Sequence, residues 1–259
     1  MLYLKMERKK YNIHYFEPED LFENYPYEVD LQTQEKYKKL EEYFTKFYYS
    51  EILEKAKKEA KEESEKKKLK KENFIYGEVN FRAISYILLY LTHEHNLLDG
   101  NGYFYDLGSG TGRAVIGAAL TASFEKYVGI EYLDSLYNTS IITKNKFEED
   151  FEQYYKENKE LLPHYKNEKN RPDIEFIHGD FLKQDLSKAS FIFINSTTFS
   201  DQLLGDLAAK FNEDCKSGCV VVNTTMELSR LDRDKWEFLP YFRRYMSWGI
   251  ATINVYKRK

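Results

Sequence analysis

The sequence predicts an α/β protein in which helices cover both faces of a mostly parallel sheet. After residue 74, short apolar segments alternate with stretches of helical periodicity, which is typical of a parallel sheet. The first five candidate strands are apolar at most positions, as strands buried on both faces should be. These strands are Tyr103–Leu107, Tyr127–Glu131, Ile174–His178, Phe191–Asn195 and Cys219–Asn223.

Two later segments extend the predicted sheet to seven strands. Ile250–Tyr256 is the sixth candidate, and the segment around Trp236–Leu239 is a short further one. Helical stretches between the strands include Arg113–Ser123, Leu136–Glu157 and Asp201–Phe211. Most of the first five strands end in a polar or acidic residue, and ligands bind at the carboxyl ends of strands in such sheets. These end residues are Glu131, His178, Asn195 and Asn223.

The first 73 residues differ in composition and are expected to form a helical extension rich in Lys and Glu, ahead of a main domain at 74–259. Leu31 to Lys71 contains neither Pro nor Gly, and aromatic and aliphatic residues recur in its first half at helical spacing. This pattern predicts one long helix. From Lys57 to Glu72 it is almost entirely charged, which favours a solvated helix or a disordered link.

Composition narrows the class of protein. The chain has 259 residues, 42% of them hydrophobic, and a net charge of −4. These values favour a packed core and disfavour a strongly basic, sequence-blind nucleic-acid binder. The two cysteines, Cys215 and Cys219, are too few for a disulfide framework or a zinc site, so a reducing, intracellular compartment is the expectation. The apolar run Ile84 to Leu91 is far below the ~20 residues of a membrane span.

The segment from Tyr105 to Arg113 (YDLGSGTGR) carries the main chemical signal. Its three glycines let the backbone turn sharply and approach a ligand, and the following helix begins with free N–H groups. Glu131, at the end of the next strand, is placed to accept the hydroxyls of a ribose. Because Asp106 leads the loop, a cationic ligand such as S-adenosylmethionine (SAM) is favoured over a dinucleotide, whose pyrophosphate would be repelled. The alternative is that the three glycines only form a turn between the strand and the helix.

Two further strand ends add candidate residues. Asp180 and Phe181 follow the third strand, where they are expected to bind the amino group and the face of an adenine. Asn195 and Phe199 follow the fourth strand, where an amide oxygen can orient an amine and an aromatic ring can wall a channel. The alternatives are an ordinary Gly-Asp turn and a loop cap. The Pro-Pro-aromatic motif of enzymes that methylate nucleic-acid amines is absent, which makes methylation of a DNA or RNA base a less favoured function.

Taken in order, several motifs resemble the disruptor-of-telomeric-silencing family of non-SET histone lysine methyltransferases. The resemblance runs from about Tyr76 to Trp248 and adds a Tyr-Gly-Glu segment to the glycine loop. It implies a seven-stranded, Rossmann-like methyltransferase sheet, SAM as cofactor, and transfer of methyl to a lysine ε-amine of a protein, plausibly a core histone in the nucleosome. The motifs are Tyr76–Phe81, Tyr105–Arg113, Val128–Glu131, His178–Leu182, Phe193–Asn195 with Phe199, and Ser247-Trp248.

The resemblance also implies roles for single residues. Asn195 and Phe199 would face the lysine channel as the catalytic residues. The loop containing Tyr76 and Glu78 would close over the methionine part of SAM. The cofactor-binding set is Tyr76, Glu78, Asp106, Gly108, Ser109, Gly110, Gly112, Arg113, Glu131, Asp180 and Phe181.

The chain departs from the family pattern after Ser247-Trp248. The family continues with a Thr-Gly turn and a tyrosine that lines the channel, whereas here no tyrosine follows until Tyr256. Two other functions therefore stay open: methylation of a small molecule or nucleic-acid amine, and a non-catalytic SAM-binding module. A histone substrate implies a nuclear location, and otherwise a cytoplasmic one is expected.

A basic run lies at the end of the charged extension. It is a candidate for weak contact with nucleic acid or for nuclear import, and a solvated helix face balanced by nearby glutamates explains it equally well. The basic residues are Lys66, Lys67, Lys68, Lys70 and Lys71.

Overall fold

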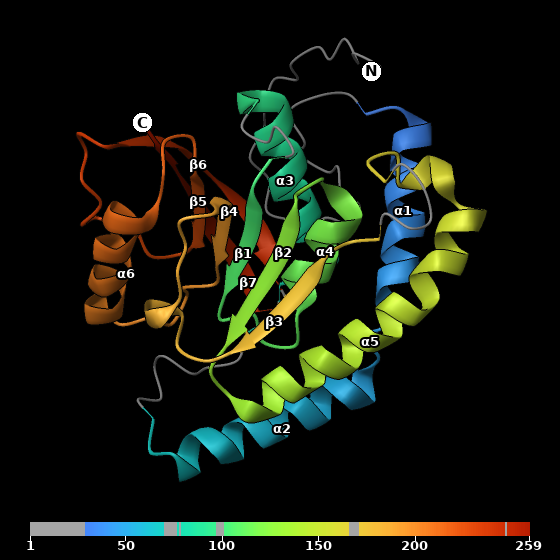
Figure 1. The fold of residues 1–259 in the computed structure, drawn as a ribbon, viewed down its shortest axis with the longest axis horizontal. Coiled ribbons are helices and arrows are strands. Elements are labelled where there is room, and N and C mark those ends of the chain that lie inside the picture. Colours follow the sequence, from blue (N-terminus) through green and yellow to red (C-terminus); the bar gives the residue numbers. More distant parts are fainter. Residues whose placement is uncertain (1–28, 70–76, 78, 97–100, 166–170, 247) are drawn as a thin grey trace.

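Seven strands form one sheet in the computed structural model, which describes residues 29–69, 77, 79–96, 101–165, 171–246 and 248–259 (Figure 1). The strand order is β3-β2-β1-β4-β5-β7-β6, so the chain reverses its direction of winding between β1 and β4. Strands β1 to β5 are parallel, and β7 runs antiparallel to both β5 and β6. The predicted class, a mostly parallel methyltransferase-type sheet, is confirmed.

The first five strands lie within one or two residues of their predicted positions. Their bounds are β1 (Tyr103–Leu107), β2 (Lys126–Glu131), β3 (Ile174–His178), β4 (Ala189–Ile194) and β5 (Val220–Thr224). The short strand expected around Trp236–Leu239 is wrong in length, since β6 spans Trp236–Met246 and pairs with β7 (Gly249–Arg258). The register shifts between Leu239 and Phe242, where Pro240 has no N–H to donate.

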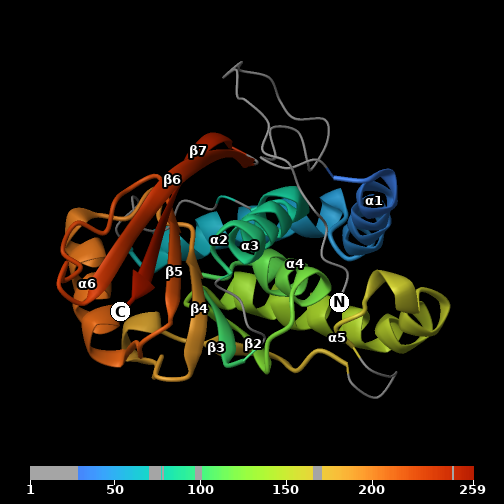
Figure 2. The ribbon, with the colours of Figure 1, turned by 90° about the horizontal axis from the view of Figure 1, so that it is seen from above.

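The two faces of the sheet have different helical covers, and Figure 2 separates them clearly. Along β4, Phe191 and Phe193 join the core shared with the helices α1, α3, α4 and α5, whereas Ile192 and Ile194 join the core beneath α6. This alternation follows from the period of two along a strand. The helices are α3 (Phe81–His95), α4 (Arg113–Thr121), α5 (Asp134–Glu157) and α6 (Asp201–Asp214).

The expected single N-terminal helix is wrong: two helices, α1 (Leu31–Thr45) and α2 (Ser50–Lys66), replace it. Tyr49, the N-cap of α2, has extended backbone angles, so the chain leaves the helical path between the two helices, where Phe47 and Tyr48 are buried. Helix α2 is not solvated all round, because Ala56 and Ala60 are buried. The predicted domain boundary at residue 74 falls within 70–76, outside the described residues, and stays a prediction.

Helix α3 contains the longest apolar run of the sequence, which the pattern did not assign to a helix. Asn80 begins it by accepting a hydrogen bond from the N–H of Ala83 at 2.7 Å, and Asn96 ends it in the left-handed region. Over the residues that the structure describes, no helix combines the length and apolar character needed to cross a bilayer.

Candidate functional site

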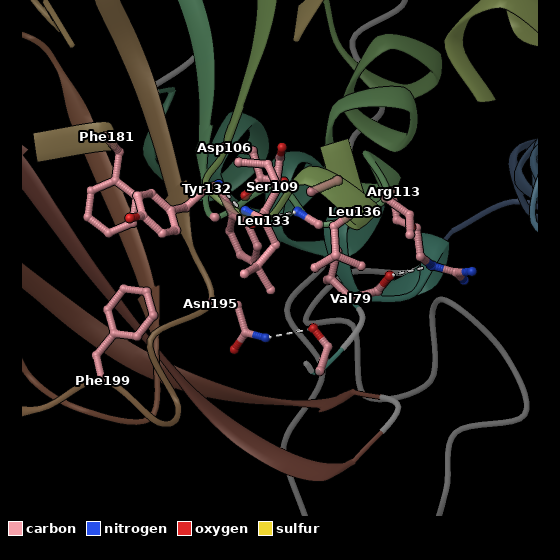
Figure 3. A pocket seen from close by; sticks show the side chains of 17 residues that line it. Val79, Asp106, Ser109, Arg113, Tyr132, Leu133, Leu136, Phe181, Asn195 and Phe199 are labelled. Atoms are coloured by element: carbon pink, nitrogen blue, oxygen red, sulfur yellow. Dashed lines mark hydrogen bonds between the residues drawn. The ribbon is translucent and has the colours of Figure 1, made fainter. Parts of the chain in front are cut away.

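The main pocket opens at the carboxyl ends of β1, β2 and β4, where the strand order reverses (Figure 3). This is the position at which open α/β sheets bind their ligands. The pocket contains ≈ 810 Å³ of space between atoms, including the part open to solvent. Its lining residues are Gly77, Val79, Asp106, Gly108, Ser109, Gly110, Thr111, Arg113, Ala114, Glu131, Tyr132, Leu133, Leu136, Phe181, Phe193, Asn195 and Phe199.

Most of the predicted site residues meet in this pocket, including both acids and both predicted catalytic residues. Two predicted residues, Gly112 and Asp180, do not line it. Tyr76 and Glu78 lie outside the described residues. The structure therefore brings together residues from four segments of the chain that the sequence had suggested separately, while the roles assigned to single residues stay predictions.

Glu131, at the end of β2, joins the glycine loop to the loop that begins α5. Its Oε2 atom accepts the N–H of Gly110 at 2.8 Å, and its Oε1 atom accepts those of Tyr132 and Leu133, both at 2.8 Å. A carboxylate offers about four acceptor positions, so one remains on Oε2. While these bonds persist, Glu131 can therefore accept one ribose hydroxyl and not the two that the sequence had suggested. Burial raises the pKa of Glu131, and the three backbone hydrogen bonds oppose that rise.

Asp106, at the end of β1, is the second acid of the pocket and is only 3% exposed. Burial, reinforced by the negative charge of Glu131, raises its pKa well above the usual value. None of the described residues donates a hydrogen bond to its carboxylate, and the buried hydroxyl of Ser109 also lacks a partner in this part of the chain. Unpaired buried polar groups are costly. Their presence at a pocket wall fits a site that a ligand with donors and positive charge completes.

One aromatic ring, from strand β3, packs against the glycine loop. Gly112 has a φ of +87°, and a Cβ atom there would overlap the ring of Phe176. A Cβ on Gly129 of β2 would meet the same ring at 2.5 Å. The absence of a side chain at Gly112 therefore lets Phe176 pack under the glycine loop. This position under the loop explains why Gly112 does not line the pocket.

Phe181 and Phe199 were expected in different subsites, but their rings lie against each other. Their centroids are 6.0 Å apart with an interplanar angle of 23°, and both rings face the pocket in Figure 3. Asp180, just before Phe181, accepts the N–H of Leu182 at 2.9 Å and so caps the short turn that carries this ring. Its second carboxylate oxygen lies 3.9 Å from the amine of the exposed Lys183.

Asn195, at the end of β4, makes three hydrogen bonds with the chain through its side-chain amide. Its Nδ2 donates to the carbonyl of Gly77 at 3.0 Å, drawn as a dashed line in Figure 3. Its Oδ1 accepts the hydroxyls of Thr197 and Thr224 at 3.0 and 2.8 Å. Gly77 itself fits closely, since a Cβ there would stand 3.0 Å from the indole of Trp248. Asn195 therefore fastens the segment before α3 to the end of β4.

Two other residues singled out in the sequence have structural contacts. Arg113 lines the pocket, but its Nε donates to the carbonyl of Val79 at 2.9 Å, and its guanidinium lies over the rings of Phe44 and Tyr48 of the N-terminal segment. Tyr256 is 2% exposed and its hydroxyl accepts the N–H of Leu228 at 2.9 Å. Tyr256 therefore belongs to the core and does not replace a channel tyrosine.

Three lining residues that the sequence reasoning missed follow Glu131 directly. Tyr132, Leu133 and Leu136 form the wall between the acid and the first turn of α5. The signal that could have found them is their position, since residues that follow an acidic strand end in such a sheet face the same ligand site. Among the described residues, no group of His, Cys, Asp or Glu is arranged to hold a metal ion.

Comparison with known families identifies the chain at the family level. The model of the family described as "Histone methylation protein DOT1" matches residues 49–234. The chain belongs to this family. The match begins just before α2 and ends just before β6, so it contains the whole described pocket up to Phe199.

Two fungal relatives carry names that agree with the DOT1 family. Proteins of Gibberella zeae and Emericella nidulans, both named "Histone-lysine N-methyltransferase, H3 lysine-79 specific", are 30% and 29% identical to this chain over 156 and 154 residues. The aligned parts cover 58% of this chain but only 28% and 27% of the two relatives. The chain therefore matches little more than a quarter of their length.

Solved structures give weaker likenesses. An RNA methyltransferase from Salinibacter ruber in complex with S-adenosyl-L-homocysteine is 21% identical, with a TM-score of 0.42 over 66% of this chain and 90% of that one. The tRNA methyltransferase TrmK of B. subtilis is 12% identical, with a TM-score of 0.47 over 71% of this chain and 67% of that one. Since both TM-scores are below 0.5, the fold of this DOT1-family chain rests on its own strand order.

Proposed function

We propose that this chain binds SAM and transfers its methyl group to the ε-amine of a protein lysine, with a histone as the substrate. The observation that carries the proposal is the pair of buried acids, Asp106 and Glu131, in one pocket at the switch point of the sheet. Membership of the DOT1 family supports the same reaction.

The polar groups of the pocket fit SAM. When bound, SAM supplies a methyl group on a positively charged sulfur and needs no metal. The Asp106 carboxylate, which no described residue bonds, suits the ligand's positive charge. Glu131 keeps one acceptor position for a ribose hydroxyl. The ring of Phe181, which lies against that of Phe199, offers an apolar surface for the adenine.

The acceptor amine is expected to approach past Asn195, on the side of the pocket opposite Asp106 in Figure 3. A lysine has an ordinary pKa of ~10.4, and only its neutral form can attack a methyl group. An apolar approach bounded by Phe199 and Phe193 would lower that pKa by desolvation. The chain's task is then positioning, which can contribute ~7–11 kcal/mol to the lowering of a barrier.

Histone H3 is the proposed substrate because both fungal relatives are named for it. A nuclear location follows from that substrate. Contact of the basic run with nucleic acid is a weaker part of the proposal, since Lys67 already binds Glu63 and Asp134 within the chain, and Lys70 and Lys71 lie outside the described residues. Lys66 and Lys68 are the exposed members of the run that stay available for such a contact.

Mass spectrometry of methylated sites tests the proposal. The chain is incubated with SAM and intact nucleosomes, and in parallel with free histones, RNA and unrelated proteins. Methylation of a histone lysine by the wild type, absent with Asp106→Ala, is the expected result. Methyl incorporation only into RNA or a small amine, or no incorporation in the presence of bound SAM, would contradict it.

A second candidate is methylation of a different amine with the same cofactor site. It is favoured by the chain's difference from the family after Trp248, because Tyr256 is buried in the core. The substrate arms of the same experiment separate the two candidates.

A further inference from the structure

Helix α2 supports the pocket from behind, although none of its residues lines it. Figure 1 shows α2 lying along α5. Ala56 and Ala60 of α2 are buried in one small cluster with Leu133 and Leu136. Since Leu133 and Leu136 line the pocket, the small side chains of α2 form the second layer of that wall.

The first turn of α5 is capped by α2 and not by its own sequence. Its N-cap residue is Leu133, which has no side chain able to accept a hydrogen bond. Glu63 of α2 fills this place: its Oε1 accepts the N–H of Asp134 at 2.8 Å, and its Oε2 accepts the N–H and hydroxyl of Ser135 at 2.9 and 2.7 Å. A carboxylate at a helix N-terminus is also favoured by the helix dipole.

Lys67 completes the arrangement one helical turn further along. Its Nζ lies 2.7 Å from Glu63 and 2.8 Å from Asp134, and 5.5 Å from the centre of the Tyr132 ring. On the other side, Nε2 of His178 lies 3.2 Å from both Asp134 and the carbonyl of Tyr132. The loop Glu131–Leu133 is thus held between α2 and the end of β3.

The partners of Glu63 favour its ionised form. Burial acts to raise its pKa, but hydrogen bonds from Lys67, Ser135 and Asp134 outweigh burial and lower the pKa to about 2. Four donors from these three residues fill the acceptor positions of its carboxylate.

We propose that Glu63 and Lys67 act as a clamp that positions the loop Glu131–Leu133 for cofactor binding. They are positioning residues, because they act through the acid loop and touch neither reacting group. The clamp rests on the proposed function, since its purpose is to hold Glu131 at the ribose. It assigns to the N-terminal helix α2 a part in cofactor affinity, although the helix lies 65 or more residues before the loop in the sequence.

The clamp predicts a loss of cofactor affinity in Glu63→Gln, because an amide supplies one acceptor oxygen for four donors. Coupling between sites typically changes affinity about 5–150-fold, and we expect a loss of about fivefold to tenfold. Calorimetric titration is done with SAM and with S-adenosylhomocysteine. Because the clamp acts at the ribose, both ligands should weaken equally, although only SAM carries the positive sulfur.

Matched controls separate the clamp from a general role in stability. Glu59→Gln removes the acid of the exposed Lys55–Glu59 pair, which has the same spacing on the same helix, and should leave both affinities unchanged. Lys67→Arg keeps the charge and should bind as the wild type does, whereas Lys67→Met should weaken binding. The melting temperature of each unliganded variant is measured alongside.

Amide hydrogen exchange of the unliganded protein provides a readout that does not depend on the cofactor. In Glu63→Gln, the N–H groups of Tyr132, Leu133 and Gly110, all held by Glu131, should exchange faster, while those of β5 should not change. Wild-type affinity in a folded Glu63→Gln, or a lower melting temperature with unchanged affinity and exchange, would overturn the clamp. If the wild type bound neither ligand, the proposed function would fail, and the exchange experiment would still decide whether α2 holds the loop.

Discussion

The two ends of the pocket differ in how far the chain satisfies its own polar groups. At the β1 end, the carboxylate of Asp106 has no donor among the described residues, and burial raises its pKa. At the β4 end, every polar atom of Asn195 is bonded, to Gly77, Thr197 and Thr224. Among the described residues, the first end therefore leaves a carboxylate for a ligand, whereas the chain itself holds the side chain at the second end.

This difference suggests a division of tasks. An unsatisfied buried acid favours tight binding of a cationic ligand, because the ligand removes a cost that the empty protein bears. An amide bonded at both its nitrogen and its oxygen favours a fixed geometry, because three hydrogen bonds hold its rotamer. We expect changes at the β1 end to alter affinity, and changes at the β4 end to alter the transfer step.

Asp106→Asn should have the largest effect. Truncating one partner of a buried, hydrogen-bonded charge pair typically costs about 2–5 kcal/mol, so SAM affinity should fall about 100-fold or more in calorimetric titration. The substitution should also stabilise the empty protein. The raised pKa of Asp106 means that the folded state holds its proton more strongly, so wild-type stability falls as the pH rises above the ordinary value of 3.8.

Urea unfolding checks that second expectation. Asp106→Asn should be more stable than the wild type at pH 7, and the difference should shrink as the pH falls below 3.8, where the wild-type carboxyl becomes protonated in both states. Equal stability of the two proteins at pH 7 would contradict the burial of an unpaired charge.

Gly112→Ala tests the support beneath the β1 end. Backbone strain and overpacking each cost about 1–3 kcal/mol, and here the new Cβ would also overlap Phe176. Gly218→Ala is a matched control, because Gly218 has a φ of +89° but nothing within 4 Å of the added Cβ. The difference in unfolding free energy between the two variants isolates the overlap. Equal losses would remove Phe176 from the explanation.

The sequence was most informative where chemistry and topology agree locally. Asp106, the glycines and Glu131 lie at the ends of neighbouring parallel strands, so a single rule about strand ends brings them together. Their hydrogen bonds, however, required the fold: nothing in the motif says that Glu131 uses three of its acceptor positions on its own backbone. The same limit applies to Phe181 and Phe199, which follow different strands and were assigned to different ligands.

Contacts between distant segments were beyond the sequence pattern. Glu63 lies in a stretch that is almost entirely charged, and its cap on α5 joins residues 71 and 72 positions apart. Helical periodicity continues through residues 46–49, although α1 ends at Thr45 and α2 begins at Ser50. The length of β6 was underestimated because Pro240 interrupts the pattern, while pairing with β7 continues on both sides of it.

Asn195→Ala tests the β4 end and should mainly affect transfer. Losing the bond to Gly77 frees the segment before α3, and misplacement of this kind should lower the rate about tenfold or more. SAM affinity should change by no more than a few-fold. Single-turnover methylation of nucleosomes and calorimetry measure the two quantities separately. An affinity loss as large as that of Asp106→Asn would contradict the inference that the β1 end sets affinity and the β4 end sets the transfer step.

The pH dependence of affinity should give the smallest effect and sharpens the comparison without a mutation. Asp106 has a raised pKa in the empty protein, and a positively charged ligand favours its ionised form. Binding should therefore release protons and strengthen by a few-fold as the pH rises towards the raised value, and level off above it. Calorimetry in buffers of different ionisation enthalpy counts those protons. Because Asn195 does not titrate, Asn195→Ala should keep the same profile, whereas Asp106→Asn should flatten it. If Asp106→Asn kept the wild-type slope, the titrating group would lie elsewhere in the pocket, and Glu131, whose pKa burial also raises, would be the group to replace next.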